Sequence, residues 1–339
     1  MEFKYHSQFD VSLKDAWNRL LSESIDHLPF LRFEYLHNWW LTRGGGEWNQ
    51  NSQLVLITAH RGDTLIGVAP LFVAEHDGKT CLLNLGAIEI SDFLNFLVRP
   101  EDLDEFTRGL LDFLGHHAEI PTWEKIELYN ILESSAVINT LKKESAALKW
   151  NFKSERLQPA PYVTLSGDWE TYLANIDKKQ RHEIRRKIRR LENADEKSRW
   201  YIVKDQSTLD EEIQAFFALM MQDPQKEKFL TDDMKTAMRN LIHAAFDEGY
   251  LQFVFLEIEG QKAAAYLNFD YNNRIWVYNS GFDDQFLSWS PGWVLLSYLL
   301  QWANENKRGE FDFLRGDEKY KYRFGAVDRF IRKITITRS

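Results

Sequence analysis

The 339-residue chain holds a single cysteine, Cys81, so no disulfide can form within it and no cysteine-based zinc or CxxC redox site is possible. It also lacks a GxSxG nucleophile elbow, a P-loop and a Rossmann fingerprint, and its histidines show no metal-ligand spacing. No apolar run approaches the roughly 18 residues that a membrane helix needs, and residues 1–12 do not read as a signal peptide. We therefore expect a cytoplasmic protein without a transmembrane segment or a metal, in which Cys81 is a buried structural thiol.

Basic residues are outnumbered by acidic ones, 42 to 51, but are dense in one segment. The formal net charge is −9, yet residues 178–190 contain eight Lys/Arg and one Glu, a local charge of +7, which leaves −16 for the rest of the chain. An acidic protein with one dense basic segment is not a general nucleic-acid coat. The segment instead predicts one place that holds an anion.

The two halves of the sequence repeat one order of predicted elements. Each half reads as two helices, a β-hairpin with glycine in its turn, a third strand, a helix and a further strand. The hairpins and the helices that follow them are expected at 54–72, 251–269, 101–118 and 291–306. We predict two α/β domains, 1–160 and 161–339, each a mixed β-sheet flanked by helices; one large α/β domain is the alternative.

Several long stretches carry a resemblance to a known family. They are YVTLSGDWETYLANIDKKQRHEIRRKIRRLE at 162–192, the block from SPGW to FDFLRGDEKYKYRFGA within 281–326, FLRFEYLHNWW at 30–40 and SDFLNFLV at 91–98. In these residues and in its element order the chain resembles the CelD/BcsL-like, FemAB-related acetyltransferases, which are tandem-GNAT bacterial proteins linked to exopolysaccharide or cell-envelope genes. The resemblance implies tandem GNAT-like domains and acyl-CoA as co-substrate, with no tightly bound cofactor.

The start of the second-half helix is the candidate donor site. Serine suits an N-cap, proline the first helical position, and glycine lets a ligand approach the backbone. The free N–H groups of a helix N-terminus can hold pyrophosphate, and the resemblance implies that CoA binds here. The four residues are Ser290, Pro291, Gly292 and Trp293. SWSPGW stands where the GNAT superfamily usually has Gln/Arg-x-x-Gly-x-Gly/Ala. The alternative to a donor site is an ordinary capped helix start.

All seven residues from 317 to 323 are charged or phenolic, directly after the strand expected at 310–316. Such a cluster suits the mouth of a cleft. Asp317 or Glu318 would take a proton from the attacking group, and the resemblance implies that Tyr320 or Tyr322 protonates a leaving thiolate. The candidates for holding phosphate or carboxylate are Arg315, Lys319, Lys321 and Arg323. A solvated charged loop is the alternative.

The basic segment is predicted to lie on a helix over 168–193, which Ser166 or Asp168 would cap. Apolar residues form only a narrow stripe on it, so most of its surface is basic. The substrate-binding candidates are Lys179, Arg181 and Arg185. The helix would clamp a phosphorylated sugar carrier or nucleotide, dock on anionic lipid headgroups, bind tRNA, or remain a solvated face.

The resemblance predicts acyl transfer from acyl-CoA to an amine or hydroxyl of a sugar, polysaccharide or cell-envelope precursor. The acceptor would attack the thioester directly, without a covalent enzyme intermediate. Asp92 in the first half would bind acceptor, or lie in a solvated loop. Two alternatives stand beside this prediction: an aminoacyl-tRNA-dependent FemAB-like transferase, and a non-catalytic binding protein that retains the fold.

Overall fold

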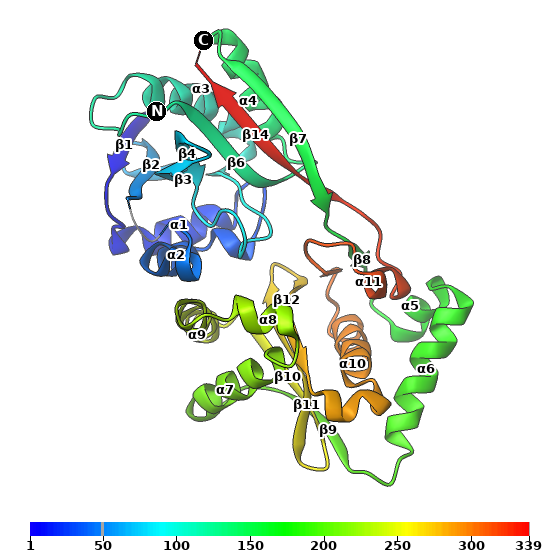
Figure 1. Cartoon of the computed structure of the whole chain (residues 1–339). Coiled ribbons are helices and arrows are strands. Elements are labelled where there is room, and N and C mark those ends of the chain that lie inside the picture. The colour runs from blue at the N-terminus through cyan, green and yellow to red at the C-terminus, as the bar shows by residue number, and fades with distance from the viewer. Residues whose placement is uncertain (49–50, 339) are drawn as a thin grey trace. The chain divides into compact units, whose positions relative to one another are not determined.

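The computed structural model describes residues 1–48 and 51–338. Its contacts divide the chain into two compact units, Met1–Gln158 with Phe330–Ser339, and Pro159–Arg329. The chain therefore passes from the first unit to the second and then returns. Each unit is built on its own mixed β-sheet with helices packed against it, which confirms the expected α/β class (Figure 1).

The first unit contains an eight-stranded sheet in the order β1-β2-β3-β4-β6-β14-β7, with β5 beside β3. Its strands are β1 (Glu2–His6), β2 (Gln53–Arg61), β3 (Thr64–His76), β4 (Lys79–Asn84), β5 (Leu97–Val98), β6 (Lys125–Leu132), β7 (Asn151–Pro159) and β14 (Phe330–Thr337). Its α-helices are α1 (Lys14–Leu21), α2 (Phe33–Gly46), α3 (Leu103–His116) and α4 (Val137–Ala147). Short 3₁₀ turns cover Val11–Leu13, Pro29–Leu31 and Pro100–Asp102.

Helices cover both faces of this sheet, and both faces carry apolar side chains. Val55 and Ile57 of β2 belong to the core beneath α3 and α4. On the other face, Trp39 of α2 packs on Phe72 of β3 with ring centroids 5.2 Å apart. Near-continuous burial along β2 and β3 is the expected pattern for strands that are covered on both sides.

The last strand departs from the expected domain boundary. The sequence assigned all residues after 160 to the second domain, but β14 pairs antiparallel with β6 of the first unit, Ile334 opposite Leu128. The reason is the alternation of its apolar side chains: Ile334 and Ile336 are fully buried in the first unit's core.

The second unit has a six-stranded sheet in the order β8-β13-β12-β11-β10-β9. Its strands are β8 (Tyr162–Thr164), β9 (Ser198–Ile202), β10 (Leu251–Ile258), β11 (Gln261–Tyr271), β12 (Arg274–Phe282) and β13 (Glu310–Asp312). Its α-helices are α5 (Trp169–Asn175), α6 (Lys178–Glu192), α7 (Leu209–Met220), α8 (Pro224–Phe229), α9 (Asp232–Asp247), α10 (Pro291–Glu305) and α11 (Lys319–Arg323). The 3₁₀ turns are η4 (Gln206–Thr208) and η5 (Asp284–Trp289).

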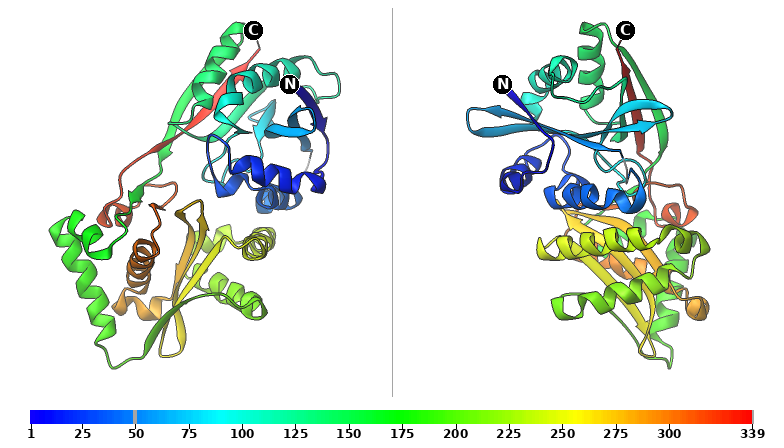
Figure 2. Two further views of the ribbon diagram at one scale, coloured as in Figure 1. Left: turned by 180° about the vertical axis from the view of Figure 1, so that it is seen from behind. Right: turned by 60° about the vertical axis from the view of Figure 1, so that its left-hand side comes forward.

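Alternate residues of the central strands face two different helix layers in this unit. Val254 and Leu256 of β10 join the core under α10, α5 and α6. Phe253 faces the other way and packs edge-on against Phe216 of α7, at 5.3 Å between centroids. Figure 2 shows the two helix layers on either side of the sheet from two further directions.

The single helix expected over 168–193 is two helices in the structure. Asp168 caps α5 by accepting a hydrogen bond from Thr171 N, as the sequence predicted. The chain then turns at Ile176, and Asp177 caps α6 by accepting from the amides of Lys179 and Gln180. A second capping aspartate at this point explains the break.

The repeated element order predicted from the sequence is present in both units. In the first, the hairpin β2–β3 continues through β4 and α3 into β6, and β4 pairs parallel with β6. In the second, the hairpin β10–β11 continues through β12 and α10 into β13, and β12 pairs parallel with β13. Within the described part of the chain, no helix is both long and apolar enough to cross a membrane.

Candidate functional site

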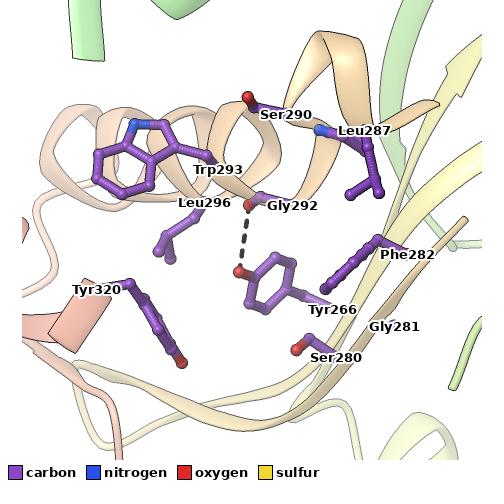
Figure 3. A pocket seen from close by; sticks show the side chains of 11 residues that line it. Tyr266, Ser280, Gly281, Phe282, Leu287, Ser290, Gly292, Trp293, Leu296 and Tyr320 are labelled. Carbon is purple, nitrogen blue, oxygen red and sulfur yellow. Dashed lines mark hydrogen bonds between the residues drawn. The ribbon is translucent and has the colours of Figure 1, made fainter. Parts of the chain in front are cut away.

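A cavity lies where two parallel strands of the second unit separate. β12 and β13 pair over three residues, from Arg274 opposite Glu310 to Trp276 opposite Asp312, after which β12 continues without that partner. The space beside the rest of β12 is a cavity of about 280 Å³ (Figure 3). Its lining residues are Tyr266, Ser280, Gly281, Phe282, Leu287, Ser290, Pro291, Gly292, Trp293, Leu296 and Tyr320. The four expected donor-site residues are therefore all in one cavity wall.

The N-terminal turn of α10 forms that wall. Ser290 is the N-cap residue, as the sequence predicted, but it has a left-handed φ of 53° and its side chain makes no capping hydrogen bond. The first amide with a backbone partner in the helix is that of Val294, which donates to Ser290 O. The amides of Gly292 and Trp293 therefore receive no capping hydrogen bond from the Ser290 hydroxyl. Together with the positive end of the helix dipole, these N–H groups attract an electronegative ligand.

Two tyrosines face each other across the cavity (Figure 3). Tyr266 of β11 is buried and its hydroxyl donates to Gly292 O at 3.2 Å. Tyr320 of α11 packs edge-on against Phe313. Burial, and then the negative charge of Glu318, raise the pKa of Tyr320 well above its ordinary value, so its phenol stays protonated at neutral pH.

Lys226 of α8 lies beside this cavity and was not predicted from the sequence. Its ammonium donates to Ser280 O at 2.5 Å. Burial lowers its pKa, while Asp223 and Glu318 act in the opposite direction. Nothing in the segment PQKEKF marks this half-buried lysine, because its partner on β12 is distant in the sequence. Gly281 of β12 lets α7 lie close to the strand, since a Cβ there would be 2.6 Å from Met220 N.

The charged segment after β13 is a short helix rather than a loop. Asp317, Glu318 and Lys319 are exposed and do not line the cavity, whereas Tyr320 does. Arg315 is half-buried in the turn before the helix. The structure therefore brings one of the three predicted catalytic residues into the cavity and leaves the two carboxylates at its edge.

Lys321 is a correction to the predicted substrate-binding set. Its side chain is buried, and its ammonium donates to the carbonyls of Leu314, Arg315 and Gly316 at 3.3, 2.7 and 3.2 Å. It also pairs with Glu318 at 2.8 Å. These bonds satisfy the turn that follows β13, so the lysine is a structural group with no donor left for a substrate.

The basic helix α6 directs its cations to different places. Arg181 donates to the carbonyls of Leu173 and Ala174 at the end of α5, and Arg185 pairs with Glu170. These two predicted substrate ligands are engaged in holding α5 to α6. Lys179 instead lines a separate groove of about 580 Å³, together with Arg323 of α11.

In the first unit, Asp92 is half-buried in the connection between β4 and β5. Cys81 is a free, buried cysteine, as expected. One oxygen, nitrogen or sulfur atom each from His76, Cys81 and Glu127 lies within 4.8 Å of the others. The ammonium groups of Lys125 and Lys333 are 3.0 and 2.7 Å from Glu127 Oε1, and their positive charges oppose a cation at this place.

Residues 178–322, which cover most of the second unit and its cavity, match the family model described as acetyltransferase (GNAT) domain. The match covers less than half of the chain and includes the N-terminus of α10, which lines the cavity. No curated protein sequence matches the chain.

Solved structures resemble both units together. FemX is 12% identical, with 98% of this chain and 97% of that chain covered and a TM-score of 0.70. A conserved protein of unknown function from Bacteroides thetaiotaomicron VPI-5482 is 14% identical, with 99% and 100% covered and a TM-score of 0.61. L-PGS from Bacillus licheniformis is 12% identical, with 97% and 92% covered and a TM-score of 0.57. These likenesses concern the fold alone, which in each unit is a mixed sheet flanked by helices.

Proposed function

We propose that the protein transfers an acyl group from a thioester donor, bound in the cavity between β12 and α10, to an amine or hydroxyl acceptor. The observation that carries the proposal is the uncapped N-terminal turn of α10, which forms one wall of a cavity in the gap between two parallel strands. Backbone N–H groups held in place before the reaction stabilise negative charge on a carbonyl oxygen at little reorganisation cost.

Acyl-CoA is the donor that we propose. Its pantetheine chain would lie along the apolar side chains of the cavity, Phe282, Leu287 and Leu296, while Ser290 to Trp293 would present amides to its polar atoms. β12 carries a bulge between Val277 and Asn279, where two residues of β11 pair with non-consecutive residues. The extra residue, Tyr278, leaves a break in the ladder on the strand that borders the cavity.

The reaction would proceed by direct attack. The acceptor nitrogen or oxygen forms a bond to the thioester carbon, the carbon–sulfur bond breaks, and the acceptor loses one proton while the departing thiolate gains one. Tyr320 is the proposed proton donor to the sulfur, because its protonated phenol lines the cavity. Glu318 or Asp317 is the proposed base; Glu318 has the stronger support, since its charge acts on both Tyr320 and Lys226.

The acceptor that we propose is an amino-sugar, polysaccharide or other cell-envelope precursor in the cytoplasm, in line with the CelD/BcsL-like resemblance of the sequence. Lys319, exposed on α11, is the candidate for an acceptor contact close to the cavity, and Asp92 stays a candidate in the first unit.

An aminoacyl-tRNA-dependent transfer is the second candidate. Two observations favour it: the likeness to FemX over the full length of both chains, and the absence of a basic residue from the turn SWSPGW. The third alternative, a non-catalytic protein, predicts a filled cleft. The open cavity of about 280 Å³ argues against it.

Calorimetric titration with acetyl-CoA and CoA tests the proposal. We expect saturable binding that Gly292→Glu abolishes, because its side chain would enter the cavity beside Phe282 and place a negative charge at the helix start. Gly292→Ala is the control, since a Cβ there meets Phe282 at an ordinary 3.5 Å, and we expect its affinity to stay within threefold. A folded wild-type protein that binds neither ligand would contradict the acyl-CoA donor.

A further inference from the structure

Cations from two helices line up beside the donor cavity. Four of them lie on α6, and at 100° per residue they fall within a sector of about 100° on one face of that helix. The fifth is on α11. We name these five residues the cationic strip: Lys179, Arg186, Lys187, Arg190 and Arg323. From Lys179 to Arg190 the strip is about 16 Å long at 1.5 Å per residue.

The strip runs from the groove on α6 to the start of α10. Lys179, Arg186 and Arg323 line the groove of about 580 Å³. Lys187 Nζ lies 4.4 Å and the Arg323 guanidinium 6.0 Å from the centre of the Trp293 ring. Trp293 lines the donor cavity, so Arg323 of the groove lies beside a side chain of the cavity wall.

Arg190 extends the strip to the turn that precedes α10. Its guanidinium lies 5.2 Å from the centre of the Trp289 ring, and Trp289 is the last residue of η5, directly before the N-cap Ser290. The turn SWSPGW contains no basic residue of its own. Positive charge near the N-terminus of α10 is therefore supplied by α6, a helix far away in the sequence.

The charge of the strip is only partly neutralised. Glu183 accepts two hydrogen bonds from Arg186, both 2.8 Å long, and lies 3.8 Å from Lys187. One carboxylate among five cations leaves an excess of about four positive charges. The side chain of Lys187 is 19% exposed, and this partial burial lowers its pKa, with Glu183 acting in the opposite direction.

We propose that the cationic strip binds phosphate groups of the donor whose reactive end occupies the cavity. The inference rests on the proposed function, because it uses the contact between strip and cavity at Trp293. Arginine forks bind phosphate oxygens through paired charge-assisted hydrogen bonds, and cations on three of the four turns from Lys179 to Arg190 suit several phosphates better than one. The donor class is thus a carrier with two or more phosphates at one end of its acyl-bearing arm.

The test separates the two ends of such a donor. The probes are 3′-phosphoadenosine 5′-diphosphate, which is the phosphate end of CoA, pantetheine, which carries no phosphate, and a short single-stranded RNA. The strip variant Arg190→Gln/Arg323→Gln removes two exposed cations. The control variant Lys178→Gln/Arg189→Gln removes two exposed cations from the other side of α6, with the same change in net charge.

We expect 3′-phosphoadenosine 5′-diphosphate to bind at least tenfold more weakly to the strip variant and within twofold of wild type to the control, with pantetheine unaffected by both. Wild-type binding should also weaken as NaCl is raised. Loss of RNA binding alone in the strip variant would support the strip with an RNA carrier as the phosphate source. Equal binding by wild type and the strip variant, equal loss in both variants, or no binding of either phosphate probe to wild type would overturn the proposal.

Failure of the proposed function gives a different pattern. If pantetheine does not bind, or if Gly292→Glu leaves its binding unchanged, the cavity is not the donor site. The strip is still read separately, because Arg190→Gln/Arg323→Gln leaves the residues that line the cavity unchanged and its effect is measured with the phosphate probes.

Discussion

A phenol that stays protonated inside the cavity is useful for one step, delivery of a proton to a departing sulfur. Tyr320→Phe removes that hydroxyl and keeps the ring that packs on Phe313. We expect turnover to fall by about 100-fold, the lower end of the range for general acid catalysis, while donor affinity stays within twofold. The measurement is single-turnover acyl transfer, compared with the dissociation constant for the donor.

Tyr322→Phe is the matched control for that variant. Tyr322 is two residues further along α11, is exposed, and donates to Asp328 at 2.8 Å rather than lining the cavity. Its turnover should equal that of wild type. If both variants lose activity equally, or neither does, Tyr320 is not the acid.

Among the structural elements, β6 and β14 are joined by a charge cluster around Glu127. Burial alone would raise the pKa of Glu127, but hydrogen bonds from Lys333, Lys125 and His76 lower it from 4.5 to about 2. A carboxyl group whose pKa is lower in the folded than in the unfolded protein stabilises the folded state at pH values above the unfolded pKa. That contribution is lost as the pH falls from about 4.5 towards 2.

Glu127→Gln should therefore destabilise the first unit by about 3 kcal/mol at neutral pH, because it leaves two half-buried ammonium groups without their carboxylate. The free energy of unfolding should also depend less on pH between 4.5 and 2 than in wild type. Denaturant unfolding at a series of pH values checks both. A variant with the wild-type pH slope would show that Glu127 does not titrate as described.

The sequence predicts elements whose burial pattern is local and misses those whose role depends on distant contacts. The hairpins β2–β3 and β10–β11 and the helix α10 follow from apolar periodicity and from Ser290-Pro291, and the structure has them where expected. Lys321 and Lys226 could not be assigned in this way. Lys321 is buried against the carbonyls of the turn after β13, and the Lys226 ammonium donates to a carbonyl of β12. Neither contact can be predicted from the spacing of residues along the sequence.

For the whole molecule, the return of the chain to the first unit gives a testable consequence. Ile334→Ala removes fully buried apolar volume from β14, which costs about 2–5 kcal/mol in protein cores. Although Ile334 follows the entire second unit in sequence, we expect hydrogen-exchange protection to fall in β2, β3 and β6 and to stay unchanged in β10 and β11. Loss of protection in β10 and β11 instead would contradict the assignment of β14 to the first unit.

The position of β14 between β6 and β7 also sets an order of events during synthesis. All strands of the second sheet emerge from the ribosome before β14 does, so that sheet can close first, since domains fold as units while the chain emerges. The first sheet stays incomplete between β6 and β7 until β14 emerges, although its other strands were made long before. The half of the protein that is translated earlier is thus the one that matures later, and its open strand edges are where a nascent chain would need protection from aggregation.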